Sequence, residues 1–148
     1  LAKRSVRVVP TRNAAEGVVA LLALDPSLDA AGNAGPMLEA ARATQTLQVT
    51  EAVRDAKVGG KRVKKGQTIV LDPDDGLVAV DGDCQKAVLA ALGSLAPGFE
   101  LVTLYYGEGA DLEHAEGLAR LISGWRSGIE VELIHGGQPH YRYLIAAE

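Results

Sequence analysis

The sequence predicts an α/β domain with a mixed sheet, flanking helices and a short antiparallel meander. Two observations carry this prediction. From residue 83 onward the pattern runs helix, strand, helix, strand, which is typical of parallel strands joined by right-handed crossovers. Between residues 55 and 82 the hydrophobic period stays near two and turn residues recur at short intervals, which indicates short antiparallel strands.

The first part of the chain offers one strand and two helices. The Val-rich stretch SVRVVPT, residues 5–11, predicts a short strand. Asn13 is a good N-cap for the following helix AAEGVVALLALD. DAAGNAGPMLEAARAT predicts a second helix with Pro36 near its first turn, where proline is tolerated. The first of these helices has one apolar face, formed by Val18, Leu21, Leu22 and Leu24.

The stretch TLQVTEAVRD alternates as a strand does, and one of its sides combines Leu47, Val49, Glu51 and Val53. In the meander that follows, the pairs Gly59-Gly60 and Asp75-Gly76 close tight turns. The meander also carries a basic group of side chains: Lys61, Arg62, Lys64 and Lys65. A solvated strand edge protected by lysine is the favoured interpretation of this group, and a patch for phosphate or an acidic partner is the alternative.

Two capped helices alternate with strands in the second half of the chain. Asp83 caps CQKAVLAALGSLA, and Asp111 caps LEHAEGLARLISGWRSG. FELVTLYYGE and IEVELI are the strands that follow them, and a last strand comes after the turn HGGQPH. The helical stripes expected to be buried are Ala87, Val88, Ala91, Leu92 and Leu95 in the first helix, and Leu112, Ala115, Leu118, Ala119 and Ile122 in the second.

Composition excludes several classes of protein. A length of 148 residues with 47% hydrophobic side chains suffices for one buried core. A formal charge of −4 and a pI near 5.4 argue against nucleic acid as the main partner. The single cysteine excludes an internal disulfide framework and fits a reducing cytoplasm. No apolar run is long enough to span a membrane. Because the chain starts at Leu1, we expect it to be a piece of a longer protein.

The candidates for chemistry are few. Cys84 lies just inside a helix N-terminus, where a thiol pKa can be lowered, although a small buried helix residue is the favoured interpretation. His114 is expected to be solvated. His135 and His140 flank Gly-Gly-Gln-Pro, which is not a helical metal-ligand spacing, and no third or fourth ligand lies nearby in the sequence, so no metal is expected there. The chain contains no Gly-rich loop ending in Lys-Ser or Lys-Thr that would cradle phosphates.

Four stretches, taken in order, carry a family resemblance: VVPTRNAAEGVVALLALDP, TEAVRDAKVGGKRVKKGQTIVL, ELVTLYYGE and HGGQPHYRYLIAAE. Together they resemble the C-terminal region of the ATP-binding subunit of bacterial fatty acid kinase, which is related to dihydroxyacetone kinases. The resemblance covers nearly the whole chain. Its most specific parts are the Pro-Thr-Arg-Asn segment, the Tyr-Tyr-Gly-Glu strand end and the Gly-Gly-Gln-Pro turn.

The resemblance implies a single C-terminal domain, residues 1–148, of a longer kinase subunit, with a fold similar to DegV-type proteins and dihydroxyacetone kinase. It implies a non-catalytic domain in cytoplasmic lipid metabolism that docks a DegV-type fatty-acid-binding protein, whose fatty acid is phosphorylated. ATP and magnesium would be bound in another part of the parent protein, and no cofactor is expected here. Pairing of the domain with itself is left open. The alternative is an independent small-molecule-binding or hydrolytic domain that uses His135, His140 and Cys84.

The residues expected to bind the partner follow strands at positions where α/β sheets place binding crevices. Exposed tyrosine and arginine are typical interface anchors, and one of the two adjacent tyrosines is expected to pack into the core because a strand alternates. Arg54 is interpreted as part of a surface network with Glu51 and Asp55, the alternative being that it is aimed at a partner carboxylate or an acyl phosphate. The partner-binding set is Thr11, Arg12, Asn13, Tyr105, Tyr106, Glu108, His135, Gly136, Gly137, Gln138 and His140.

Overall fold

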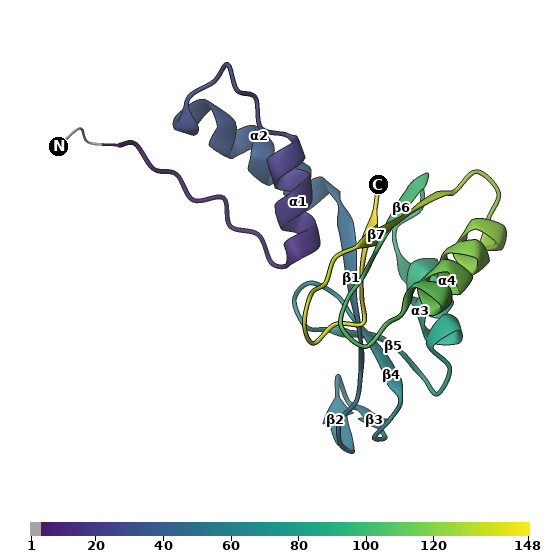
Figure 1. The fold of residues 1–148 in the computed structure, drawn as a ribbon. Coiled ribbons are helices and arrows are strands. Elements are labelled where there is room, and N and C mark those ends of the chain that lie inside the picture. Colours follow the sequence, from purple (N-terminus) through teal and green to yellow (C-terminus); the bar gives the residue numbers. More distant parts are fainter. Residues whose placement is uncertain (1–3) are drawn as a thin grey trace. The chain divides into compact units, whose positions relative to one another are not determined.

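The computed structural model describes residues 4–148, which divide into two compact units, residues 4–44 and 45–148 (Figure 1). Each unit is built differently. The first contains the helices α1 (Ala14–Leu22) and α2 (Ala30–Ala43), and the second contains every described strand together with two further helices. This content confirms the predicted class, a mixed α/β fold.

The helices of the first unit begin at side-chain caps. Asn13 accepts a hydrogen bond from the backbone N–H of Glu16, as predicted, and Asp29 accepts one from Gly32. The connection between the helices is held by the buried side chain of Asn33, which accepts from the backbone N–H of Asp25 at 2.7 Å and donates to three carbonyls. Both helix starts therefore have local side-chain partners.

Two expectations for the first unit are wrong. Residues 5–11 form no strand, because no described strand pairs with them. Pro36 lies in the interior of α2 rather than in its first turn, since the helix starts at Ala30, six residues earlier, after the Asp29 cap. The apolar side chains Val18, Leu21, Leu22 and Leu24 are exposed, and the buried side chains of α1 are Ala15, Glu16 and Ala20.

The second unit is organised around a six-stranded sheet in the order β5-β4-β1-β8-β6-β7. All neighbouring strands pair antiparallel except β6 and β7, which are parallel, as predicted for a strand-helix-strand unit. Consequently the carboxyl ends of β1, β5, β6 and β7 lie at the same end of the sheet, which we call the strand end of the sheet. The strands are β1 (Gln45–Glu51), β4 (Thr68–Leu71), β5 (Leu77–Asp81), β6 (Leu101–Tyr106), β7 (Glu130–His135) and β8 (Tyr143–Ala147).

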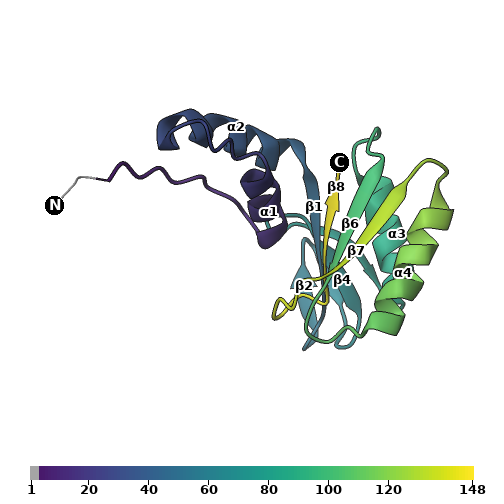
Figure 2. The same cartoon turned by 45° about the horizontal axis from the view of Figure 1, so that its top comes forward.

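Helices α3 (Cys84–Ser94) and α4 (Leu112–Trp125) lie on the same face of this sheet (Figure 2). Asp83 and Asp111 cap them, as predicted. Their buried stripes agree with the sequence except at three positions. Leu95 ends α3 and is only partly buried, Ala119 is also partly buried, and Leu112 is 52% exposed because it lies on the first turn, beyond the packed face. The core between helices and sheet is aliphatic, with Leu47, Val88, Leu92, Leu104, Leu118, Ile122 and Ile145 at its centre.

The meander splits into two parts. Strands β4 and β5 join the main sheet, whereas β2 (Ala56–Val58) and β3 (Lys61–Val63) pair only with each other. The predicted turns are present, with φ of 55° at Gly59 and 80° at Gly60. Strand β1 ends at Glu51, so Val53 does not continue its apolar side and is 82% exposed.

The turn between the last two strands does not make a hairpin. Strand β7 is at the edge of the sheet, whereas β8 lies between β1 and β6. The connecting segment, residues 136–142, must therefore cross the end of β6 before the chain enters β8. This crossing places the predicted Gly-Gly-Gln-Pro turn over the end of the Tyr-Tyr-Gly-Glu strand.

Candidate functional site

The crossing brings two of the three predicted groups of partner-binding residues together at the strand end of the sheet. Their shared position follows from the parallel pairing of β6 and β7, in which Tyr106 is opposite His135. We call this group the strand-end surface, and it comprises Tyr105, Tyr106, Glu108, His135, Gly136, Gly137, Gln138 and His140.

Gln138 fixes the crossing segment in one conformation. Its side-chain amide donates to the backbone carbonyls of Tyr105, at 3.1 Å, and Tyr141, at 3.3 Å. Its own carbonyl accepts from the backbone N–H of Glu108 at 2.9 Å. The amide group of the Gln138 side chain is therefore engaged by β6 and by the loop itself, and its N–H groups are not free for a partner.

Close backbone approach explains the glycines here. A Cβ on Gly107 would collide with the backbone oxygen of Gln138, and a Cβ on Gly136 would collide with the side chain of the same glutamine. Gly137 has a φ of 64°, a left-handed conformation that glycine adopts without strain. His140 has a φ of 70° and is exposed, while its carbonyl accepts from the Thr50 hydroxyl at 2.8 Å. Tight contacts therefore hold the loop in place.

The aromatic side chains of the surface divide between the two faces of the sheet, as strand alternation predicted. Tyr106 packs against the aliphatic core, and its ring lies 4.9 Å from the ring of His135, centroid to centroid. Tyr105 is half-buried, and burial, followed by the charges of Glu148 and Glu132, raises its phenol pKa. The groups left exposed for a partner are His135, His140 and Glu108.

The third predicted group, Thr11, Arg12 and Asn13, belongs to the first unit. Asn13 caps α1, and the guanidinium Nε of Arg12 donates to the fully buried carboxylate of Glu16 at 2.7 Å. Two of these three side chains thus have structural partners within their own unit.

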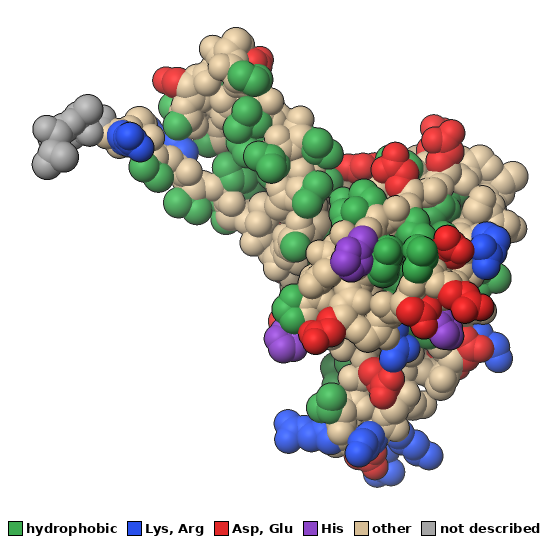
Figure 3. Space-filling model, in the orientation of Figure 1, with side chains coloured by type: hydrophobic (Ala, Val, Ile, Leu, Met, Phe, Trp, Pro, Cys, Tyr) green, Lys and Arg blue, Asp and Glu red, His purple; other side chains and the backbone are tan. Residues whose placement is uncertain are grey.

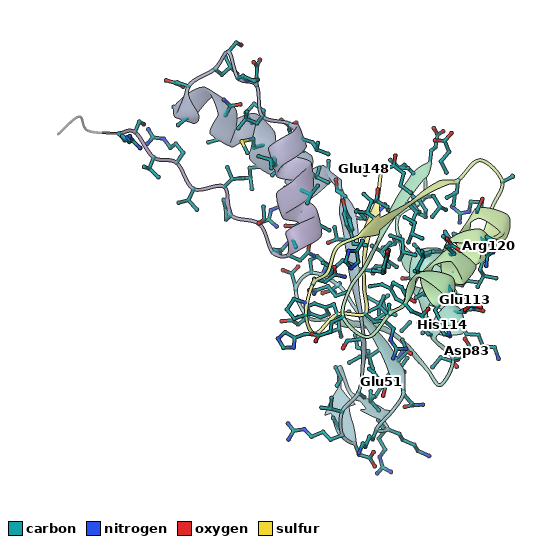
Figure 4. All side chains as sticks on the ribbon, in the orientation of Figure 1. Glu51, Asp83, Glu113, His114, Arg120 and Glu148 are labelled. Atoms are coloured by element: carbon teal, nitrogen blue, oxygen red, sulfur yellow. The ribbon has the colours of Figure 1, made fainter. Side chains whose placement is uncertain are left out.

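A pocket of about 240 Å³ opens beside the strand-end surface, where α3 and α4 begin. Figure 4 shows Asp83 and His114 at the same end of the helix layer. The ring of His114 is exposed, as expected, and its Nδ1 lies 2.7 Å from Asp111 Oδ1. Neither His135 nor His140 lines this pocket, so the three residues of the enzymatic alternative do not converge in it. Its lining is Cys84, Gln85, Gly109, Ala110, Asp111, His114, Leu118, Arg142 and Tyr143.

Two side chains of this pocket, Cys84 and Tyr143, have raised pKa values. Burial raises the pKa of the Cys84 thiol, and the neighbouring Arg142 and Thr68 oppose this shift only in part. Burial also raises the pKa of Tyr143 to about 12. Both side chains therefore stay protonated, and the interpretation of Cys84 as a buried helix residue is supported.

The pairing of Arg142 had no signal in the local sequence. Its guanidinium lies 3.0 Å from the carboxylate of Glu51, the last residue of β1. Glu51 is thereby removed from the network predicted with Arg54 and Asp55, and Asp55 instead accepts from the backbone N–H of Lys65 at 2.8 Å. The predicted network is wrong, because Arg142 reaches Glu51 only through the pairing of β1 with β8, two strands far apart in the chain.

Comparison with known proteins identifies the family. A family model for the C-terminal region of FakA-like proteins, the fatty acid kinase A-like subunits, matches residues 1–148. Protein YloV of Bacillus subtilis is 34% identical over 143 residues, which is 97% of this chain and 26% of that protein. The chain belongs to the FakA-like C-terminal family. An uncharacterized protein of Staphylococcus haemolyticus is 33% identical over 148 residues, 95% of this chain and 26% of the relative.

Family membership confirms the resemblance drawn from the four sequence stretches. The chain spans about a quarter of the length of these relatives, and its description as a single C-terminal domain of a longer kinase polypeptide stays a prediction. Across residues 4–148, no three His, Cys, Asp or Glu side chains are grouped so as to hold a metal ion. None of the described helices is both long and apolar enough to cross a membrane.

Proposed function

We propose that this chain is a non-catalytic docking domain of a fatty acid kinase. Its strand-end surface binds a DegV-type fatty-acid-binding protein in the cytoplasm, and the carried fatty acid is phosphorylated there. ATP and magnesium are bound by another part of the kinase. The family match supports the link to fatty acid kinase.

One observation carries the choice of surface: the crossing segment is held by hydrogen bonds while His140 within it and His135 at the end of β7 stay exposed. The hydrogen bonds of Gln138 to Tyr105 and Tyr141 fix the loop before any partner arrives. A preorganised loop loses little conformational entropy on binding, so more of the contact energy appears as affinity. Imidazole and carboxylate groups at the rim, from His135, His140 and Glu108, offer hydrogen bonds to a protein surface.

The direct test is the affinity of the purified chain for a DegV-type protein from the same genome, measured by calorimetry. Gly137→Val forces a side chain into a left-handed conformation and should weaken binding by about 1 to 3 kcal/mol. Gly128→Val is the matched control. Gly128 also has a left-handed φ, 86°, but it lies before β7, at the opposite end of the sheet.

His135→Ala tests the same surface without backbone strain, and His114→Ala is its control on α4. We expect the first variant to bind more weakly and the second to bind as the natural chain does. Equal affinities for folded His135→Ala, Gly137→Val and the natural chain would refute docking through this surface.

A second measurement addresses the chemistry. Titration of the chain with magnesium and ATP should give no binding heat, because the sequence lacks a loop that cradles phosphates. Micromolar binding of ATP would contradict a purely docking role. It would make the pocket beside Cys84 a candidate site for the nucleotide.

A further inference from the structure

The β2–β3 segment concentrates positive charge in an acidic chain. We call residues 54–65 the basic hairpin. They contain six Lys or Arg residues and one carboxylate, a formal charge of +5, whereas the whole chain carries −4. The remaining residues therefore carry −9. In Figure 3 the Lys and Arg side chains gather over β2 and β3, at the bottom of the view.

The charges of the basic hairpin are not neutralised by neighbours. The ion pairs given by the described residues involve Arg12, Arg42, His114, Arg120 and Arg142, all outside the basic hairpin. Its one carboxylate accepts a hydrogen bond from a backbone N–H rather than from a cationic side chain.

Like charges also face each other within the hairpin. Lys57 is directly opposite Arg62 in the two-stranded register, an arrangement that destabilises a β ladder. Lysines on a strand edge protect it from pairing with other chains, but edge protection does not account for a repulsive pair in register between the two strands. A bound polyanion would relieve this repulsion.

The position of the basic hairpin is fixed by its base. The backbone N–H of Lys64 donates to the Gln67 side chain, and that of Gly66 donates to the carbonyl of Ala52, each at 2.8 Å. Val63, a residue of the hairpin, is buried. Together with Asp55, Ala56 and Val63, the cations Lys57, Arg62 and Lys64 line a groove of about 420 Å³. The cations are thus presented on a folded element.

We propose that the basic hairpin binds the phosphate headgroups of an anionic membrane surface. Its sequence contains no aromatic residue, whereas aromatic side chains anchor protein interfaces and stack on single-stranded nucleic acid. Lysine is depleted in protein interfaces but adds attraction to anionic lipid with each residue near the surface. Val53, 82% exposed next to Arg54, supplies an apolar side chain for the headgroup boundary. The proposal does not rest on the docking function.

The test is co-sedimentation of the chain with vesicles of phosphatidylcholine alone and with vesicles that also contain phosphatidylglycerol. We expect partition onto the phosphatidylglycerol vesicles only, and a decrease as salt rises because exposed charges are screened. The double variant Lys57→Glu and Arg62→Glu should lower the partition coefficient about tenfold or more. The double variant Arg4→Glu and Arg7→Glu makes the same change in net charge outside the hairpin and should keep most of the binding.

Two further measurements distinguish binding to the membrane surface from binding to other ligands. Val53→Ser leaves the charge unchanged and should weaken partition by a smaller factor than the charge reversal. Inorganic phosphate should not displace the chain from vesicles at equal ionic strength. Absence of partition, an equal loss in the Arg4 and Arg7 control, displacement by free phosphate, or hairpin-dependent binding to RNA in place of vesicles would each overturn the proposal. Circular dichroism of every variant establishes that the fold is intact.

Discussion

The two units of this chain bury very different side chains. The second unit encloses large aliphatic groups, among them Leu104 and Ile145, each with no exposed area. The first unit buries alanines and a glutamate, and leaves larger side chains such as Leu21 and Leu22 65% and 80% exposed. One unit is therefore held by hydrophobic packing, whereas the other depends on small contacts around a buried ionic cluster.

A matched pair of leucines should show this difference most strongly. Leu104→Ala removes a fully buried side chain and should lower the free energy of unfolding of the second unit by about 3 kcal/mol. Leu21→Ala removes a side chain that is 65% exposed and should change stability by less than about 0.5 kcal/mol. Chemical denaturation followed by Trp125 fluorescence and by amide hydrogen exchange in α1 reports the two units separately. Equal losses would show that the contrast is false.

The ionic cluster of the first unit gives the next largest effect. Arg12→Ala leaves the buried Glu16 carboxylate with Arg42, 3.4 Å away, and the backbone N–H of residue 12, and should cost about 2 kcal/mol. Arg120→Ala is the control, since Arg120 and Glu116 are also four residues apart but are both well exposed. That variant should lose no more than about 0.5 kcal/mol. Similar stabilities of the two variants in denaturation would contradict a structural role for Arg12.

Acid should destabilise the first unit, with a smaller effect than the Arg12→Ala substitution. Burial alone raises the pKa of Glu16, but the hydrogen bonds and charge of Arg12 and the charge of Arg42 outweigh it, so the net pKa is lowered. A lowered pKa stabilises the folded state above the ordinary value of 4.5, and this stabilisation is lost as the pH falls through the folded-state pKa. Hydrogen exchange in α1 should therefore speed up in acid.

The matched control for the acid experiment is Glu16→Gln, which has no titrating group at this position. Its α1 exchange should be faster at neutral pH and should depend less on pH in the acid range. If the natural chain and this variant respond to acid identically, Glu16 does not provide the acid sensitivity of the first unit.

Local sequence was sufficient for several features that depend only on neighbours in the chain. The caps Asn13, Asp83 and Asp111, and the turn at Gly59-Gly60, are all present because they need only residues a few positions away. The parallel pairing of β6 and β7 was also predictable, since a strand-helix-strand unit of this length leaves few alternatives.

Features that need a distant partner were missed. Residues 5–11 have strand propensity, but a strand requires a neighbour to pair with. Glu16 is polar in a helix pattern, and its burial is compensated in part by Arg42, which lies twenty-six residues later. The site shows the same division: the left-handed φ of Gly137 is a local property that glycine permits, whereas the role of Gln138 depends on β8 lying beyond β6.

The central position of β8 has a consequence for synthesis of the protein. Residues 143–147 pair with both β1 and β6, about a hundred and about forty residues earlier in the chain. Until Tyr143–Ala147 have left the ribosome, the edges of β1 and β6 that face each other have no partner. The sheet therefore closes only after its last strand emerges, and such long-range pairing folds slowly. During translation, unpaired strand edges of this kind invite aggregation, so the nascent chain gains from protection by chaperones over this interval.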